Sequence, residues 1–234
     1  MNSTVSICIP SYEFSGKGVF FIKKNIDSCL EQDYENLEII ISDQSNNNEI
    51  ELFVESYGNE KIKYFKNENN RGFPAYNTNN AIEKSVGDYI KIMNQDDYIE
   101  NKSLIKLMVD ECKKNKWAVS GFKHLNYDNN SFFNPLTPII KEDGTHLLRG
   151  ENLVGCPSVG MIPKNEFFDT VIEYMIDSEL WYRMFKKYGY PGIVPGENIV
   201  IGISSQSFSS FLRNKTDKMI EKEYEYCKTK FNLT

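Results

Sequence analysis

Short apolar runs alternate with amphipathic segments through the first 97 residues. The apolar runs are rich in Val and Ile, as in buried parallel strands, and the segments between them repeat apolar residues at helical spacing. The pattern predicts strands over Val5–Ile9, Leu37–Ser42, Lys61–Lys66 and Tyr89–Met93, and helices over Val19–Glu31, Glu49–Tyr57 and Phe73–Ser85. Pro74 fits the first turn of the last helix. This alternation predicts an α/β fold with a Rossmann-like, mostly parallel central sheet flanked by helices.

The second half of the chain has a weaker pattern. It predicts strands over Trp117–Tyr127 and Gly155–Ile162, a loop-rich flap over Asp128–Gly150, and helices over Glu179–Lys187 and Lys215–Lys230. We expect one domain over 1–234, made of halves 1–97 and 98–207 and a helical tail 208–234. The mixed Glu and Lys residues of the tail favour a docked helix, with a partner subunit or a membrane surface as alternative docking sites.

Composition narrows the classes of function. The net charge of −6 and the pI of about 5.2 argue against nucleic acid as a partner. No apolar run approaches the roughly 20 residues that span a bilayer, so we expect a cytoplasmic protein, with peripheral contact to the inner face of the cytoplasmic membrane as an alternative. The five cysteines are widely spaced and form no Cys-x-x-Cys pair, which favours reduced thiols over disulfides or zinc.

Polar side chains follow three of the first four predicted strands. Pro10, Ser11, Tyr12 and Glu13 follow the first strand, Asp43 the second, and Asn94, Gln95, Asp96 and Asp97 the fourth. Ligands of such sheets bind beyond the carboxyl ends of the strands. Tyr and carboxylate side chains suit a nucleoside, and paired carboxylates suit a Mg²⁺ or Mn²⁺ diphosphate. No Gly-x-Gly-x-x-Gly or Gly-Lys-Ser/Thr motif is present, which argues against a dinucleotide dehydrogenase and a P-loop NTPase.

Five segments occur in a characteristic order. They are Val5–Glu13, Ser28–Ser45, Asn70–Asn77, Gly87–Asp97 and, ahead of a helix, Ile176–Arg183. Together they resemble the family 2 inverting glycosyltransferases of GT-A fold. Each segment alone is weak, but five in order are specific. The resemblance implies a donor half over 1–97 and an acceptor and catalytic half over 98–207.

The resemblance also implies roles for the matching residues. The nucleotide-sugar donor would lie against Pro10, Ser11, Tyr12, Glu13, Asp43, Arg71, Asn77, Asn94, Gln95 and Asp96. Asp43 would bind the imide of uracil or thymine, and Arg71 and Asn77 would lie near the phosphates or the sugar. Asp96 and Asp97 would hold Mn²⁺ or Mg²⁺, and Asp177 would be the general base.

The chain departs from the family pattern at two places. Asn94 stands where the first aspartate of the Asp-x-Asp signature usually lies, so one anionic ligand is lost. Ile201–Ser207 lacks the histidine that many relatives carry there, which puts a contact from this C-terminal loop to the metal or diphosphate in doubt.

The chemistry of Asp177 can be argued without the resemblance. Inverting transfer is a single displacement in which one carboxylate takes the proton of the acceptor hydroxyl while a divalent cation stabilises the departing diphosphate. A capping or first-turn role in the following helix is an equally strong reading of Asp177. Glu179 is the reserve candidate for the base, and an i,i+4 ion pair is expected between Glu179 and Arg183. Asp96 and Asp97 on their own would read as a turn after a strand.

The sequence leaves three functional alternatives. The preferred one is transfer of a hexose from a UDP-sugar to a hydroxyl of a saccharide, with a lipid-linked intermediate of bacterial surface polysaccharide (O-antigen or capsule) as acceptor by resemblance. A dTDP-deoxysugar donor, as in a rhamnosyl transferase, is the close variant. A non-catalytic nucleotide or sugar-binding module is the second alternative, and a nucleotidyltransferase is disfavoured because the first strand is followed by Pro10-Ser-Tyr-Glu13 instead of a glycine-rich loop.

Overall fold

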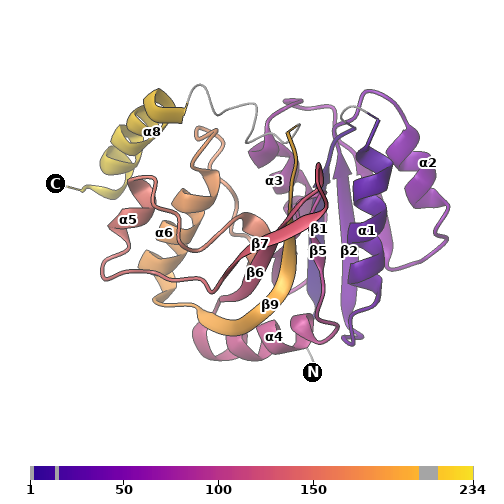
Figure 1. Cartoon of the computed structure of the whole chain (residues 1–234), viewed down its shortest axis with the longest axis horizontal. Helices are drawn as coiled ribbons and strands as arrows, with labels where there is room; N and C mark the ends of the chain where they lie inside the picture. Colours follow the sequence, from indigo (N-terminus) through magenta and orange to yellow (C-terminus); the bar gives the residue numbers. More distant parts are fainter. Residues whose placement is uncertain (1–2, 14–15, 206–215, 234) are drawn as a thin grey trace.

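One sheet runs through both halves of the molecule. The structure, a computed structural model, describes residues 3–13, 16–205 and 216–233 of the chain. The strands are β1 (Val5–Ser11), β2 (Leu37–Asp43), β3 (Ile62–Lys66), β4 (Tyr89–Ile92), β5 (Tyr98–Ile99), β6 (Ala118–Asn126), β7 (Ser131–Leu136), β8 (Gly160–Pro163) and β9 (Gly192–Ile203). In the described residues they form one sheet of order β3-β2-β1-β4-β8-β6-β9-β5, with β7 paired to β6 (Figure 1).

Helices cover this sheet and its left-hand end in Figure 1. They are α1 (Gly18–Leu30), α2 (Glu49–Glu55), α3 (Pro74–Lys84), α4 (Leu104–Asn115), α5 (Thr145–Leu148), α6 (Ile176–Tyr188) and α8 (Thr216–Phe231), with a short 3₁₀ turn η1 (Pro157–Val159). The strand order reverses after β3, so right-handed crossovers put α1 and α2 on one face of the sheet and α3 on the other.

The first half folds as its pattern predicts. Strands β1 to β4 are mutually parallel, and Ile7, Ile9 and the run Ile39–Ile41 are fully buried between the two helical layers. Each predicted strand and helix is present, and its ends agree to within a few residues. Burial on both faces is the reason that these strands read as continuous apolar runs. The expected α/β fold with a mostly parallel sheet is confirmed.

The second half contains elements that the sequence pattern did not predict. They are β5, α4, β7, α5 and β9. The segment 128–150, expected as a flap without regular structure, contains β7 and α5. The end of β9 includes Ile201–Ile203, the first part of the expected C-terminal loop Ile201–Ser207, and residues 206 and 207 of that loop lie outside the described part of the chain.

The C-terminal helix α8 docks on α6. Lys230 pairs with Asp169 and with Glu179 of α6, and the ring of Phe231 contacts that of Tyr182 edge-on at 4.8 Å. Trp117 and Trp181 are fully buried and stack at 5.8 Å, as expected for core residues. No helix in the described residues is both long enough and apolar enough to cross a bilayer.

Candidate active site

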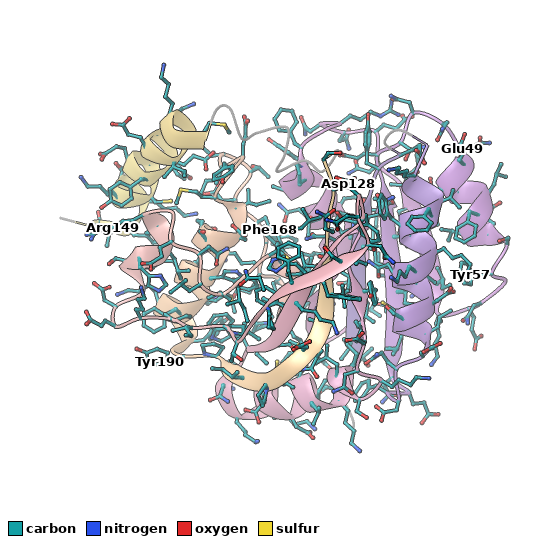
Figure 2. All side chains as sticks on the ribbon, in the orientation of Figure 1. Glu49, Tyr57, Asp128, Arg149, Phe168 and Tyr190 are labelled. Carbon is teal, nitrogen blue, oxygen red and sulfur yellow. The ribbon has the colours of Figure 1, made fainter. Side chains whose placement is uncertain are left out.

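The carboxyl ends of β1, β2 and β4 meet at the upper edge of the sheet in Figure 1. Asp128, which follows β6, lies at the same edge in Figure 2, whereas Tyr190 lies at the opposite, lower end of the molecule. The parallel register brings Pro10 beside Ser42 and Ser11 beside Asp43. The predicted residues of the first half therefore gather at one edge.

A network of buried amides and hydroxyls ties the ends of these strands together. Asn77, from α3, donates to the carbonyl of Ser11 (3.0 Å) and accepts from the hydroxyl of Ser42 (2.6 Å) and from the amide of Asn67 (3.2 Å). The side chain of Ser11 is also buried, and its hydroxyl donates to the Ser42 carbonyl (3.3 Å). Asn77 is only 3% exposed, and its side chain is occupied by these hydrogen bonds within the protein, so it holds the strand ends together and is not exposed to a ligand.

Asp43 lies fully buried at the end of β2. Its carboxylate accepts hydrogen bonds from the backbone N–H and the hydroxyl of Ser45, from the hydroxyl of Tyr64 (2.7 Å) and from the ammonium of Lys66 (3.3 Å). Four donors are about the full capacity of a carboxylate. An imide N–H of a base would reach Asp43 only by displacing one of them, and the Lys66 contact is the longest.

Gln95 fixes the loop between β1 and α1. Its side chain accepts from the backbone N–H of Tyr12 (2.7 Å) and donates to the carbonyl of Gly18 (2.9 Å). The loop presents Tyr12, which is 37% exposed. One oxygen of Glu13 accepts from the Gly18 N–H (2.9 Å), and the other is a buried acceptor without a partner in the described part of the chain. Tyr12 is therefore exposed to a ligand, Glu13 has a buried oxygen free to accept one more hydrogen bond, and Gln95 holds their loop.

Arg71 lies on the exposed loop between β3 and α3. Its guanidinium donates to the side chain of Asn46 (2.6 Å) and pairs with Glu68 (3.4 Å). Gln44 donates to the carbonyls of residues 69 and 70, which fastens this loop to the one after β2. Arg71 is exposed and held by surface contacts, so it can turn toward an anion at this edge.

Two adjacent acids follow β4. The oxygens of Asp97 accept from the backbone N–H of Gly202 (2.8 Å) and from the side chain of Asn94 (3.2 Å), and Asp97 is only 2% exposed. Asp96 is partly exposed, and its backbone carbonyl accepts from the Tyr127 hydroxyl (3.1 Å). Burial and the charge of Asp97 hold the pKa of Asp96 above its usual range. Asn94, in place of a third acid, therefore serves here as a donor to Asp97.

The acid pair suits a divalent cation. In the described residues no three His, Cys, Asp or Glu side chains converge as a complete protein-built metal site. Mg²⁺ and its relatives are, however, commonly held by one or two carboxylates together with the phosphates of a substrate. Two adjacent carboxylates, one of them facing solvent and both with raised pKa values, form an acidic site that a cation would neutralise. The carboxylates of Asp96 and Asp97 are therefore suitable ligands for a divalent metal that is bound together with a diphosphate.

Asp177 occupies the first turn of α6. Met175 is the N-cap residue of this helix, so Asp177 is a first-turn acid, one of the two structural readings that the sequence allows. One oxygen of Asp177 accepts from the N–H of Ser178 (2.7 Å) in that turn. The other oxygen accepts from the side-chain amide of Asn152 (2.9 Å). Burial raises the pKa of Asp177 from 3.8 to about 6. The reserve candidate, Glu179, is fully buried and paired with Arg183 as expected, so it is placed as a structural acid.

A short segment, residues 152–159, joins the two acidic groups. At its start Asn152 donates to Asp177, and in its middle the thiol of Cys156 donates to Asp97 (3.6 Å). Burial raises the pKa of the Cys156 thiol well above its usual value, and the charges of Asp97 and Asp177 both add to the effect. We name residues 152–159 the bridging segment.

The bridging segment is anchored to the end of β4. The hydroxyl of Ser158 accepts from the backbone N–H of Asn94 (2.7 Å), and the carbonyl of Ser158 accepts from the ammonium of Lys91. Lys91 is fully buried, and burial lowers its pKa to about 8. The sequence analysis did not identify Lys91, Asn152 or Ser158, because no motif marks residues whose partners lie far away along the chain.

Curated proteins with similar sequences are named as glycosyltransferases. An uncharacterized glycosyltransferase of Rickettsia typhi is 29% identical over 194 residues, which is 78% of this chain and 58% of that protein. An Escherichia coli protein, UDP-Glc:alpha-D-GlcNAc-diphosphoundecaprenol beta-1,3-glucosyltransferase WfgD, is 28% identical over 159 residues, covering 66% of this chain and 58% of that protein. The chain thus spans less than two thirds of the length of either relative.

Two solved structures have the same fold. Staphylococcus aureus TarS in complex with UDP-GlcNAc matches 88% of this chain and 60% of that one, with a TM-score of 0.63 and 17% identity. The mannosyltransferase PcManGT from Pyrobaculum calidifontis, in complex with GDP-Man and Mn²⁺, matches 90% of this chain and 60% of that one, with a TM-score of 0.61 and 15% identity. At such identities the likeness shows the fold.

The sequence model of one family covers most of the chain. Residues 6–170, from β1 through the acid pair to the segment after β8, match the model described as "Glycosyl transferase family 2". The match includes four of the five segments on which the resemblance rests. The chain belongs to glycosyl transferase family 2.

Proposed function

We propose that this chain catalyses the inverting transfer of a hexose from a UDP-sugar to a hydroxyl of a lipid-diphosphate-linked saccharide. The bridging segment carries the proposal, because it contacts Asp97 on one side and Asp177 on the other. A single displacement needs one acidic site for the metal diphosphate of the donor and one carboxylate for the acceptor. The two acids that fill these roles are held by one short piece of chain.

On the acceptor side, Asp177 removes the proton of the attacking hydroxyl. A raised pKa of about 6 makes it a stronger base than an ordinary aspartate while leaving it mostly ionised at neutral pH. Asn152 donates to one oxygen and fixes the orientation of the carboxylate. The Asp177 oxygens retain lone pairs beyond those that Asn152 and Ser178 use, and these can accept the hydroxyl proton.

On the donor side, Asp96 and Asp97 would hold Mn²⁺ or Mg²⁺. When bound, the cation stabilises the charge that develops on the departing diphosphate. Tyr12 would offer a ring to the base, and Glu13 would offer to a ribose hydroxyl the oxygen that has no partner among the described residues. Arg71, exposed on the loop after β3, would exchange its surface contacts with Asn46 and Glu68 for the phosphates.

The choice of UDP and of a lipid-linked acceptor rests on the comparisons. The E. coli relative is named for a UDP-glucose donor and a diphosphoundecaprenol-linked acceptor, and TarS was solved with UDP-GlcNAc. An acceptor of this kind lies at the membrane surface, so the proposal includes peripheral contact with the inner face of the cytoplasmic membrane during turnover. Assembly of a bacterial surface polysaccharide is the process that uses such acceptors.

Calorimetric titration tests the donor site first. UDP, dTDP and GDP are titrated with and without Mn²⁺ into the wild type and into Asp96→Asn, and transfer from UDP-hexoses to a synthetic lipid-diphosphate GlcNAc is then followed with Asp177→Asn as control. We expect UDP to bind only with metal, Asp96→Asn to abolish this binding, and Asp177→Asn to bind UDP normally with a kcat lower by about 10² to 10⁴.

Other outcomes would replace parts of the proposal. Binding of dTDP in preference to UDP would move the donor to a dTDP-deoxysugar. Metal-independent binding that ignores Asp96 would refute the metal-diphosphate site. Normal UDP binding without turnover for any donor and acceptor would favour a non-catalytic module.

A further inference from the structure

A buried carboxylate from the C-terminal helix binds the segment that leads into Asp177. Glu223 of α8 is 7% exposed. Its oxygens accept from the backbone N–H groups of Glu173 (2.9 Å), Tyr174 (3.1 and 3.3 Å) and Met175 (2.8 Å). These are three consecutive donors, and the last of them belongs to the N-cap residue of α6.

The partners of Glu223 are unusual for a buried charge. In the described part of the chain no Lys, Arg or His forms an ion pair with Glu223, and its hydrogen-bond partners are the three backbone N–H groups. Backbone donors at a helix N-terminus carry partial positive charge and favour an anion. Glu223 therefore adds a negative charge directly before the start of α6, beside the first-turn acids Asp177 and Glu179 of the helix itself.

Glu223 and Asp177 bind different backbone donors at this end of α6. Met175 makes no side-chain capping bond, and Asp177, in the first turn, accepts from the N–H of Ser178 and from the side chain of Asn152. Glu223 accepts from the N–H groups of residues 173–175, directly before that turn. Glu223 therefore fixes the backbone that leads into the first turn and so into Asp177.

Docking of α8 does not depend on Glu223 alone. Lys230 pairs with Glu179 and Asp169, the hydroxyl of Tyr226 donates to Asp169 (2.7 Å), and Cys227 is fully buried in the interface. These contacts fasten α8 to α6 and to the segment before it. Glu223 differs from them because it binds the backbone two to four residues before Asp177.

We propose that Glu223 is a positioning residue that sets the orientation of the Asp177 carboxylate through the backbone of residues 173–175. The inference rests on the proposed function, since it assigns Asp177 as the base. Loss of the Glu223 contacts frees three backbone donors and lets the first turn of α6 shift, and displacements of about 1 Å at a reacting group can cost about 10²-fold in rate.

The test compares Glu223→Gln and Glu223→Ala with Glu221→Gln, a matched exposed position on the same helix. Gln keeps one acceptor oxygen at nearly the same place, and Ala keeps none. We expect kcat to fall about tenfold in Glu223→Gln and about 10²-fold in Glu223→Ala, with the donor KM and the affinity for UDP and Mn²⁺ unchanged. Glu221→Gln should match the wild type in each quantity.

Backbone amide hydrogen exchange provides a readout that does not need activity. Exchange at residues 173–177 should be faster in Glu223→Gln than in the wild type or Glu221→Gln. A wild type without turnover and an inert Asp177→Asn would refute the proposed function, while faster local exchange would still show that Glu223 holds this segment.

Two results would overturn the positioning role. One is an unchanged kcat in folded Glu223→Gln and Glu223→Ala. The other is an equal loss of kcat and of UDP affinity, which would indicate a general structural effect. If Glu223→Ala does not fold, the nearly isosteric Glu223→Gln decides the question through the same two measurements.

Discussion

The contact between Asn152 and Asp177 allows the pH dependence of activity to be moved by one substitution. Asn152→Asp is nearly isosteric. The side-chain oxygen that accepts from the backbone N–H groups of Val154 and Gly155 (3.0 Å each) is retained, so these two bonds of the turn are kept, whereas the bond from the amide to the Gly155 carbonyl (3.1 Å) is lost. The amide group that donates to Asp177 at 2.9 Å becomes a second carboxylate oxygen. The substitution therefore replaces a stabilising donor with a like charge.

The size of the effect can be worked out from this geometry. A hydrogen bond to a charged group contributes about 1.5 to 3 kcal/mol, and its loss raises the pKa of Asp177 by about one unit or more. Repulsion between two charges about 4 Å apart adds about 1 kcal/mol in water and about 4 kcal/mol at an effective dielectric constant of 20. Even the smaller values of the two terms together raise the pKa of Asp177 by about two units, from about 6 in the wild type to about 8 in Asn152→Asp.

The assay is kcat/KM for sugar transfer between pH 5 and 9.5. The wild type should lose activity below pH 6, since Asp177 must be ionised to accept a proton. Asn152→Asp should be about tenfold less active at pH 7 and recover at pH 9, where the pair gives up its shared proton. Asn59→Asp, which adds the same charge at an exposed turn before β3, is the control and should follow the wild type. An acid limb that stays near pH 6 in Asn152→Asp, or a pH-independent loss of activity, would refute the assignment of Asp177 as the titrating base.

Three further predictions concern the frame of the site. The pKa of Asp177 is raised in the folded state, so its contribution to stability is complete below pH 3.8 and is lost as the pH rises through about 6. Asp177→Asn should therefore raise the free energy of unfolding at pH 8 by up to about 3 kcal/mol. Near pH 3.5 urea denaturation should show no difference from the wild type. Gly202→Ala would place a Cβ 2.3 Å from the Asp96 carbonyl oxygen and 2.6 Å from the Tyr127 ring, so it should lower stability by about 1 to 3 kcal/mol and weaken metal-dependent UDP binding in calorimetry. Gln95→Ala removes the two bonds from Gln95 to the loop of Tyr12 and leaves the bond from the Glu13 N–H to the Ser45 hydroxyl (2.7 Å). It should raise the Kd for UDP about tenfold without changing that of free Mn²⁺.

Local pattern explains why the first half could be predicted. The run Ile39–Ile41 is apolar at every position because both faces of β2 are covered, and α3 begins at Pro74 because proline suits a first helical turn. The stripe Leu104, Ile105, Met108, Val109 and Cys112 shows that α4 is encoded in the same way. The helical spacing of these residues is present in the sequence, so the local pattern is sufficient to predict α4.

The strands of the second half lack such a signal. β9 carries Pro195 and Gly196 in its middle, where the pairing with β6 shifts register, and Gly196 has a φ of 101°. Pro and Gly side by side are typical of a turn, and the pairing with β6 and with β5 makes the segment a strand. Every residue of β7 is exposed, so no alternation of buried and exposed positions marks it. These elements are specified by tertiary contacts.

The same distinction applies to the site. The ordered segments identified the edge and its acids, because each segment is a local stretch that ends a strand or begins a helix. They did not identify Asn152, which contacts Asp177 across 25 residues, or Glu223, which contacts Met175 across 48. Neither residue belongs to any of the five segments, and their roles become visible only when the chain is folded.

The structure also divides the predicted donor residues into two groups with different expected effects. Asp43 and Asn77 are buried with their hydrogen-bonding groups directed into the protein, whereas Tyr12 exposes its ring and Glu13 keeps a buried oxygen without a partner among the described residues. If the proposed donor site is correct, loss of Asp43 or Asn77 should weaken binding of different bases alike, because both shape the edge. Substitution of Tyr12 or Glu13 should change the discrimination between nucleotides more than substitution of the buried Asp43, although the motif alone assigns base recognition to Asp43.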